Sequence, residues 1–514
     1  MVEREARTGR QGRRSRQTVR IPARKPDYRR LVNTLMKQKA LSDDRIEAIH
    51  EAALRVLEEL GIKVLNDQAR ALFKRAGASV DPDTWMVRID RGLVAEALEA
   101  APSEFDMVGG SPDRTVRMGG DSVAFVCVGG PPHASDLDRG KRPSTLEDSR
   151  NFMRLSQHFD VIHLQSPSCE AQDIDVTLRH LSFTESQLSL SDKPLFIFAR
   201  GTEQVRDGFE MTRIVRGVSD NAFADTVWCY TVINTNSPRQ LDLPMCQGII
   251  DFAEAGQASV ITPFTLAGAM APVSIAGALT LQHAEALSGI VLAQIVRKGA
   301  PVVYGSFTSN VDMKSGAPAF GTPEYVKAAI AGGQLARHIG LPWRGSSPNA
   351  SNAPDEQSMH ETAMSAWGSM LGGVNMMLHS AGWLEGGLTA SLEKFILDVE
   401  MLQSFAEIFQ PLDATETEIG FDAIAAVEPG GHFFGSEHTM ERYETAFYEP
   451  LVSDWRNFGQ WTEAGGLTAS QRANGIWKSI LGSFEAPPMD PGRREEMDAF
   501  IERRTREGGA PPMG

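Results

Sequence analysis

The sequence predicts an α/β protein with a (β/α)8 TIM-type barrel, preceded by an N-terminal extension of helices and mixed α/β structure. After Asp148, short apolar runs alternate with amphipathic segments long enough for a helix, a pattern typical of a parallel sheet covered by helices. Eight such runs match the strand number of a closed barrel. The alternative, an open doubly wound sheet, is disfavoured because no GxGxxG motif follows an early strand. The runs are 161–165, 194–199, 225–231, 258–264, 301–306, 341–345, 374–379 and 423–427.

The segments between these runs carry apolar residues at helical spacing, most clearly at 276–297, 324–338, 356–371 and 390–409. The chain is therefore expected to have four parts. These are a basic, disordered tail at 1–30, a helical and mixed cap layer at 31–150, the barrel at 151–480, and a C-terminal helix and tail at 481–514.

Charge is unevenly distributed along the chain. The 514 residues carry 51 Lys and Arg against 66 Asp and Glu, a net charge of −15. Residues 1–30 alone hold eleven Lys or Arg and three acidic residues, which leaves the remainder at −23. An acidic body argues against nucleic-acid binding, which needs a basic face. The tail lacks the apolar region of a secretory signal, and although its arginines suit a transit peptide, Glu3 and Glu5 count against one.

The remaining composition narrows the class of protein further. Four cysteines are too few for a disulfide framework, and no CxxC pair offers a zinc corner. The apolar stretches are too short or too interrupted to cross a bilayer, which needs about 20 apolar residues. No HExxH, GxSxG or GxxxxGK[ST] motif is present, so neither a protein-bound metal nor a catalytic nucleophile is predicted. These features favour a cytoplasmic protein that acts on a small molecule.

In a barrel, the active site lies at the carboxyl ends of the strands. Aromatic residues gather at or near these ends, although they make up only 7% of the chain. Their negative faces attract an alkylated ammonium, which cannot donate hydrogen bonds. The alternative is that the rings pack the barrel against its helices. The aromatic candidates for substrate binding are Trp228, Tyr230, Phe264, Tyr304 and Trp383.

Two later segments add polar candidates. The loop HSAGWLEGGLTASLE at 379–393 places Glu385 two residues after Trp383 among glycines, which suits a cation site; alternatively, the loop is structural and Glu385 lies near the start of the next helix. His360 lies in a predicted helix that follows the sixth run, on the same face as Glu356, and is a further candidate.

Six stretches carry a recognisable signature. They are GGPPHASDLDRGKRPSTLED (129–148), SDKP (191–194), APVSIAGAL (271–279), GAPAFGTPEY (316–325), HSAGWLEGGLTASLEKFILDVE (379–400) and GGHFFGSEHTMERY (430–443). In these stretches the chain resembles the trimethylamine methyltransferase family, specifically its branch without pyrrolysine, which includes glycine betaine:corrinoid methyltransferases. The resemblance extends from about residue 30 to about residue 480.

The resemblance implies an eight-fold α/β barrel that demethylates a methylated amine. The methyl acceptor would be the cob(I)alamin of a corrinoid protein, a small separate partner that docks on the barrel mouth. The pyrrolysine of the family, where present, lies in the loop after the sixth strand, which maps within 346–360. This segment contains no pyrrolysine, and it also lacks the lysine expected there from common relatives.

The missing pyrrolysine favours a quaternary amine, such as glycine betaine, proline betaine or carnitine. A quaternary nitrogen leaves as a neutral tertiary amine, so in-line attack by cobalt(I) needs positioning and desolvation with little acid–base help. Arg200 or Arg344, both at strand ends, could bind a betaine carboxylate in bidentate fashion. Two alternatives stay open, a methyltransferase with another acceptor such as a folate and a non-catalytic betaine-binding barrel. A homo-oligomer is also expected, because symmetric oligomers are common among soluble proteins.

Overall fold

The computed structural model describes residues 27–513, so the predicted basic tail at 1–30 lies almost wholly outside the described residues. The described residues form two compact units. One is Leu412–Glu449, and the other comprises Asp27–Pro411 together with the chain from Pro450 onward. The central sheet belongs entirely to the larger unit.

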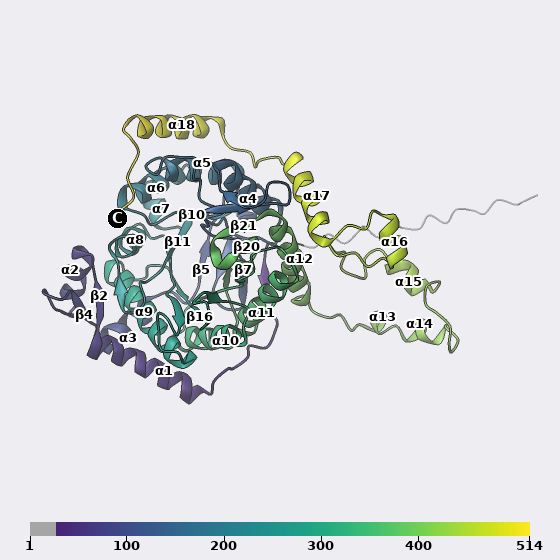
Figure 1. Ribbon diagram of the computed structural model, residues 1–514, viewed down its shortest axis with the longest axis horizontal. Helices are drawn as coiled ribbons and strands as arrows, with labels where there is room; N and C mark the ends of the chain where they lie inside the picture. The colour runs from purple at the N-terminus through teal and green to yellow at the C-terminus, as the bar shows by residue number, and fades with distance from the viewer. Residues whose placement is uncertain (1–26, 514) are drawn as a thin grey trace, which may run out of the picture. The chain divides into compact units, whose positions relative to one another are not determined.

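The larger unit is built on a curled eight-stranded sheet with the order β1-β7-β19-β18-β15-β13-β11-β10 (Figure 1). β1 pairs antiparallel with β7, and every other neighbouring pair is parallel. This confirms a mixed α/β fold whose strands are mostly parallel. In the order of the sheet, the strands are Leu31–Val32, Ser122–Phe125, Met376–Leu378, Trp343–Ser346, Val302–Gly305, Ala258–Ile261, Cys229–Ile233 and Leu195–Phe196.

An extended stretch at 163–165 lies between β7 and β10. The backbone N–H of His163 donates to the Phe125 carbonyl over 2.9 Å, and that of Gln165 donates to the Pro194 carbonyl over 3.0 Å. The first predicted run, 161–165, is therefore hydrogen-bonded through its backbone to the chain at Phe125 and at Pro194, although it forms no regular strand.

The predicted strand at 423–427 is wrong, because these residues belong to the short helix α14, Phe421–Ala425, and the turn after it. The run AIAAV is rich in alanine, the strongest helix former, and much of it is exposed, whereas a barrel strand would be buried. The place beside β19 is taken by β7, which comes from the segment 31–150 that we expected to form a separate layer. β7 is buried from Val123 onward.

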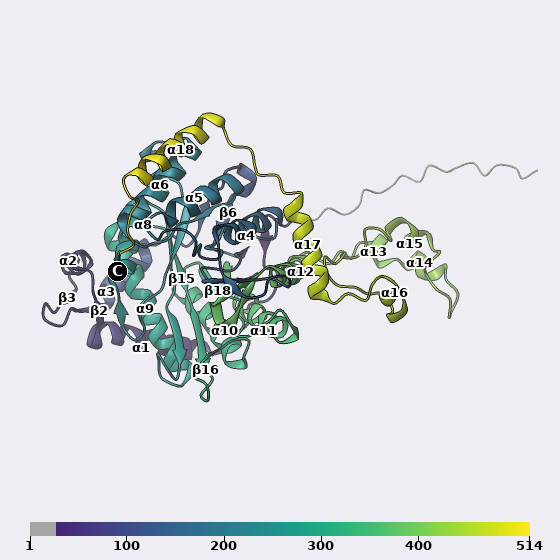
Figure 2. The ribbon, with the colours of Figure 1, turned by 45° about the horizontal axis from the view of Figure 1, so that its top comes forward.

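Helices follow the strands and surround the sheet (Figures 1 and 2). The four helices predicted most clearly are confirmed as α9 to α12, each of which begins after a residue whose side chain caps the first turn. The helices around the sheet are α4 (Leu146–His158), α5 (Arg179–Leu190), α6 (Thr202–Arg216), α7 (Asp220–Ala224), α8 (Leu243–Glu254), α9 (Ile275–Val296), α10 (Pro323–His338), α11 (Glu356–Gly372) and α12 (Leu392–Ile408).

Helix α9, with 22 residues, is long and apolar enough to cross a membrane by length and composition alone. This differs from the expectation that every apolar stretch is too short or too interrupted. Most of the helix is buried inside the protein, where it packs against α8 and the N-terminal helices α1 (Asp43–Arg55) and α3 (Arg91–Ala100). A helix that is apolar on all sides is typical of the core of a large globular unit as well as of a membrane span.

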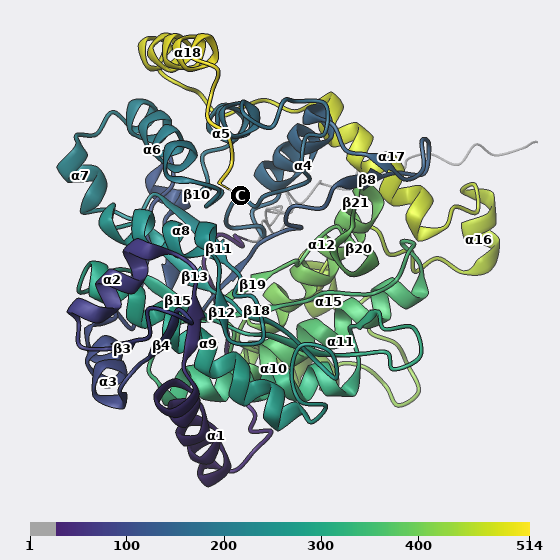
Figure 3. The ribbon, with the colours of Figure 1, turned by 60° about the vertical axis from the view of Figure 1, so that its left-hand side comes forward.

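The N-terminal extension packs against α9, beside a small sheet of order β12-β2-β4-β3 (Figure 3). Two C-terminal helices lie on other parts of the helical layer, α17 against α12 and α18 against α6 (Figure 2). The bounds of these elements are α2 Asp67–Arg75, β2 Ile62–Val64, β3 Ser79–Val80, β4 Met86–Arg88, β12 Gln240–Leu241, α16 Phe458–Glu463, α17 Ala469–Gly482 and α18 Pro491–Arg506.

Small sheets continue beyond the carboxyl ends of the central strands. β14 follows β13 and pairs in parallel with β16, which follows β15 and also pairs with β17. β20 follows β19 in a second small sheet of order β20-β21-β8-β9. These elements extend the chain past the rim of the central sheet. Their bounds are β14 Phe264–Ala267, β16 Phe307–Val311, β17 Pro318–Ala319, β20 Trp383–Leu384, β21 Thr389–Ser391, β8 His133–Ser135 and β9 Arg142–Pro143; β5 Phe105–Met107 and β6 Val116–Met118 form a separate pair.

Side chains on the inner face of the curled sheet form a packed cluster that includes Phe196, Tyr230 and Val260. Alternate residues of the same strands, such as Cys229 and Ile261, belong to the cluster that packs outward against the helices. The inside of the sheet is thus filled, and a ligand site has to be sought at the strand ends.

Candidate active site

A cavity of about 640 Å³ opens at the carboxyl ends of the central strands. Its walls come from the ends of β10 and β11 and the residues after them, from the first residues of β14 and β16, from Arg344 within β18, and from the end of β19 and the chain after it. This is the place that barrel architecture assigns to an active site. The side chains that give the cavity its chemistry are Phe198, Phe264, Phe307, Arg344, His379 and Trp383.

Aromatic rings form one wall of the cavity around Phe307. The Phe307 ring centroid lies 5.0 Å from that of Phe264, 5.3 Å from that of His379 and 6.4 Å from that of Trp383. The parallel pairing of β14 with β16 sets Phe264 directly opposite Phe307. Such a wall suits a methylated cation, which is attracted by ring faces.

Arg344 is the buried cation of this site. Its side chain is only 1% exposed, its Nε and Nη1 have no hydrogen-bond partner among the described residues, and its guanidinium carbon lies 5.1 Å from the Phe307 ring centroid. Burial lowers the pKa of Arg344 to about 10, so the group is still charged at neutral pH. Burying an unpaired charge is costly, and an anionic ligand would offset that cost.

Arg200, the other predicted carboxylate ligand, also lines the cavity but is already paired. Its guanidinium forms an ion pair with Glu170 and stacks 4.6 Å from the Phe198 ring centroid. Glu170 in turn contacts Arg179 over 3.2 Å. The charge of Arg200 is thus largely compensated, whereas that of Arg344 is not.

His379 is the first residue of the loop 379–393 and is not among the predicted binding residues. Its ring is buried, lies 3.9 Å from the Trp383 ring between centroids, and its Nδ1 is 3.1 Å from the Ser346 hydroxyl. Burial, and then the charge of Arg344, hold the pKa of His379 well below its usual range. The imidazole is therefore neutral, and it lines the cavity with an uncharged, polarisable ring.

The position of Trp383 is fixed by the loop that follows β18. Glu361 holds this loop by accepting the backbone N–H groups of Ala350 and Ser351 over 2.8 and 3.1 Å. On the other side of the ring, Gly387 adopts a positive φ of 104°, and a Cβ atom there would lie 2.5 Å from the indole. The predicted segment 346–360 therefore shapes the cavity through its backbone.

Three predicted aromatic residues lie away from the cavity. Trp228 precedes β11 and so stands at the amino end of that strand. Tyr230 points into the filled inside of the sheet, where its hydroxyl donates to the Gln165 carbonyl over 2.7 Å. Tyr304 points outward, and its hydroxyl lies 2.9 Å from Nδ1 of His283 on α9.

The two remaining predicted residues lie at the periphery. Glu385 forms an ion pair with Lys141 over 2.5 Å and accepts from the Thr389 hydroxyl over 2.7 Å, while its neighbours Gly386 and Gly387 line the cavity. His360 is exposed on α11. Of the nine predicted binding residues, the structure thus brings Phe264, Trp383, Arg200 and Arg344 together.

A model of the trimethylamine methyltransferase family matches residues 7–509. A glycine betaine methyltransferase of Desulfitobacterium hafniense strain Y51 is 36% identical over 477 residues, which cover 92% of this chain and 99% of the relative. A trimethylamine methyltransferase of the D. hafniense strain DSM 10664 / DCB-2 is 29% identical over 472 residues, covering 91% and 94%.

Among solved structures, the monomethylamine methyltransferase of Methanosarcina barkeri aligns with a TM-score of 0.48 at 10% identity, covering 91% of this chain and 96% of that one. The family match spans nearly the whole sequence and confirms the expected resemblance. This chain belongs to the trimethylamine methyltransferase family.

Proposed function

We propose that this protein removes a methyl group from a carboxylate-bearing quaternary amine, a betaine, and transfers it to the cobalt(I) corrinoid of a separate protein. The relatives named glycine betaine methyltransferase and trimethylamine methyltransferase support a methylated amine as the donor. The observation that carries the substrate class is Arg344, a buried guanidinium whose Nε and Nη1 have no partner among the described residues.

Arg344 and the aromatic wall would bind the two charges of the zwitterion. A guanidinium binds a carboxylate through two parallel hydrogen bonds, and an alkylated ammonium rests against ring faces. The guanidinium carbon is 5.1 Å from the Phe307 centroid, a short spacing that favours a betaine in which one carbon separates the ammonium from the carboxylate. Glycine betaine is such a molecule, whereas carnitine is longer.

The lining of the cavity fits methyl transfer from a quaternary nitrogen. It contains aromatic rings, amides and two guanidinium groups, and none of the described side chains that line it is a cysteine or a carboxylate. The partner's corrinoid supplies the cobalt nucleophile. This chain would hold the ammonium in line and keep water away from it, and because the nitrogen leaves as a neutral amine, the neutral His379 need not move a proton.

The proposal includes a closed (β/α)8 barrel. The sheet supplies seven parallel strands. The stretch 163–165, which is hydrogen-bonded to Phe125 on one side and to Pro194 on the other, would take the eighth strand position. The cavity is then the barrel mouth, where the corrinoid protein would dock. The four cysteines are free and buried, which is compatible with the reducing cytoplasm. The homo-oligomer stays a prediction.

A methyl-transfer assay tests the reaction. Purified protein is mixed with free cob(I)alamin and a panel of glycine betaine, proline betaine, carnitine, choline and trimethylamine, and the cobalt(I) absorbance is followed. Loss of this band with a short betaine is expected. Calorimetric binding of a betaine without any transfer would favour another acceptor, such as a folate, or a binding role.

A pair of arginine variants tests the substrate class. Arg344→Gln should weaken glycine betaine binding by about 10-fold to 100-fold, because hydrogen bonds between charged groups contribute about 1.5–3 kcal/mol. Binding of choline, which has no carboxylate, should change little. Arg200→Gln is the matched control, because its charge is already paired with Glu170. Equal losses for both ligands in Arg344→Gln would contradict a carboxylate site.

A further inference from the structure

The unit Leu412–Glu449 exposes large apolar side chains that nothing in its own fold covers. Phe421 is 71% exposed, Phe434 82% and Phe447 83%. Phe421 begins the short helix α14, and Ile424 of the same helix is also exposed, at 58%. Exposed apolar patches of this kind usually mark a surface that binds another chain segment or protein. We call the surface formed by Leu412–Glu449 the acidic surface.

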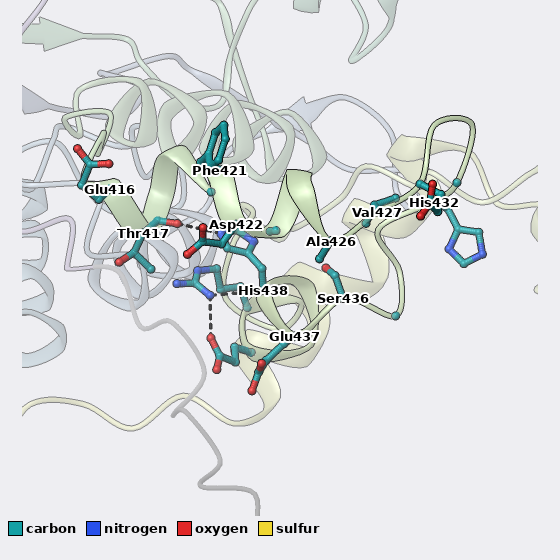
Figure 4. A pocket seen from close by; sticks show the side chains of 17 residues that line it. Glu416, Thr417, Phe421, Asp422, Ala426, Val427, His432, Ser436, Glu437 and His438 are labelled. Atoms are coloured by element: carbon teal, nitrogen blue, oxygen red, sulfur yellow. Dashed lines mark hydrogen bonds and ion pairs between the residues drawn. The ribbon is translucent and has the colours of Figure 1, made fainter.

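The same unit is rich in carboxylates, and Phe421 lines a hollow together with several of them. A hollow of about 940 Å³ in this unit is lined by five acidic side chains, and Figure 4 shows several of them around α14 and the helix α15, Glu437–Arg442. Over the whole segment 412–449 there are nine Asp or Glu against one arginine. That arginine, Arg442, is already paired with Glu418 and Glu441 over 3.2 and 3.0 Å. The segment therefore carries a charge of −8 with His neutral.

The same chain contains a segment of opposite charge. Residues 1–26, which lie outside the described residues, hold eight arginines and one lysine against Glu3 and Glu5, a net charge of +7. Arginine suits this surface better than lysine for two reasons. A guanidinium pairs with carboxylates in bidentate fashion, and it also stacks on aromatic faces. A separate basic protein would have to compete with a segment that is tethered and so has a high effective concentration.

We propose that residues 1–26 dock on the acidic surface of the same chain. The contact neutralises most of the charge of both segments and covers the exposed rings with guanidinium groups. Twenty-six residues can span up to about 90 Å when extended, so the tether allows an intramolecular contact. The contact would be electrostatic in large part and therefore sensitive to salt.

Calorimetry with a synthetic peptide tests the docking. The peptide comprises residues 1–26, and it is titrated into a protein that starts at Asp27. Binding is expected at 50 mM NaCl and should weaken by tenfold or more at 300 mM NaCl. The charge reversals Glu428→Lys and Glu441→Lys, both at exposed positions that line the hollow, should together weaken binding by tenfold or more.

A matched control separates a specific contact from a general effect of charge. Glu96→Lys and Glu99→Lys change the net charge equally on the exposed face of α3 and should leave peptide binding unchanged. Equal losses in both double variants, or no binding at low salt, would overturn the proposal. If the reversed protein does not fold, hydrogen exchange of the wild type decides: amides of 412–449 should exchange more slowly in the full chain than in the protein starting at Asp27.

Sedimentation of the full chain shows whether residues 1–26 dock on their own chain or on a second copy of it. A sedimentation coefficient that does not depend on protein concentration, together with slower exchange at 412–449, supports docking within one chain. Concentration-dependent association that is lost when residues 1–26 are removed would overturn the intramolecular contact in favour of a second copy.

Discussion

Asn349 and Trp383 hydrogen-bond to each other twice. The Trp383 indole Nε1 donates to the Asn349 carbonyl over 3.2 Å, and the Asn349 side-chain Nδ2 donates to the Trp383 carbonyl over 2.6 Å. This reciprocal pair joins the loop after β18 to strand β20 and fixes the ring that lines the cavity. The orientation of the Trp383 ring is thereby set by hydrogen bonds between the segments that follow β18 and β19, two strands that are consecutive in the sequence and adjacent in the sheet.

Replacing Trp383 by Ala should weaken glycine betaine binding by about 1–2 kcal/mol, the range for a desolvated cation–π contact. Trp383→Phe should lose less, because it keeps a ring while it loses the bond to the Asn349 carbonyl. Isothermal calorimetry measures both, with Trp367→Ala on α11 as a control outside the cavity. An unchanged affinity in Trp383→Ala would remove this ring from the binding site.

Gly387→Ala should displace the same ring without removing it. The new Cβ would lie 2.5 Å from Cη2 of Trp383, and φ at this position is +104°, so both the contact and the backbone oppose a side chain. We expect weaker betaine binding and a shifted tryptophan emission maximum. Gly316→Ala is the matched control, because it also has a positive φ, of +74°, but would meet no atom within 4 Å. Equal effects of the two variants on binding would point to backbone strain alone.

The sequence predicts the regular part of this fold well because apolar runs and amphipathic helices alternate with little interruption. It misplaces one strand of the sheet. β7 lies in a stretch of short strand-like pieces, SVAFVCV, where local pattern cannot tell a central strand from a cap. AIAAV at 423–427 resembles a buried strand only in composition, and its exposure shows that burial cannot be inferred from an apolar run alone.

The strand-end rule finds the region of the site but not the direction of each side chain. Tyr304 and Phe307 lie three residues apart, so strand alternation sends them to opposite faces, and only Phe307 reaches the cavity. Val303 lies on the inner face, and counting from it in steps of two residues reaches Phe307 but not Tyr304. Arg200 and Arg344 look equivalent in sequence, because the partner that neutralises Arg200 is Glu170, thirty residues away.

The C-terminal residues should contribute to the cavity through its loops. The Ala510 N–H donates to the Thr177 carbonyl, the Gln204 amide donates to the Ala510 carbonyl, and the Met513 N–H donates to the Arg200 carbonyl, all between 2.8 and 2.9 Å. A protein that ends at Gly508 loses these bonds, each of which contributes about 1 kcal/mol to stability. We expect a lower melting temperature and a several-fold higher KM for betaine with a nearly unchanged kcat.

Gln204→Leu is the intermediate case, because it removes one of the three bonds and leaves the chain length unaltered. Its effect on KM should lie between those of wild type and the truncated protein. A truncated protein whose KM equals that of wild type would show that the C-terminal contacts stabilise the fold without holding the cavity loops in place.

His163 should make the protein less stable in acid. The Phe125 N–H donates to its Nδ1 over 3.0 Å, its Nε2 lies 2.9 Å from the Tyr28 carbonyl, and burial, with the charge of Lys193 next, lowers its pKa to about 3. The unfolded chain, with an ordinary pKa of about 6.5, therefore binds more protons between pH 6.5 and 3. The stability due to neutral His163 is fully present above pH 6.5 and falls as the pH drops through this window.

His163→Gln keeps a side-chain acceptor and a donor but cannot titrate. Between pH 8 and pH 5, wild type should lose about 2 kcal/mol more unfolding free energy than this variant, because 1.5 pH units below the unfolded pKa correspond to about that amount. Urea denaturation at the two pH values measures the difference, and the comparison cancels the contributions of the other buried histidines. Parallel losses in the two proteins would mean that His163 is protonated in the folded state and that its two hydrogen bonds do not hold it neutral.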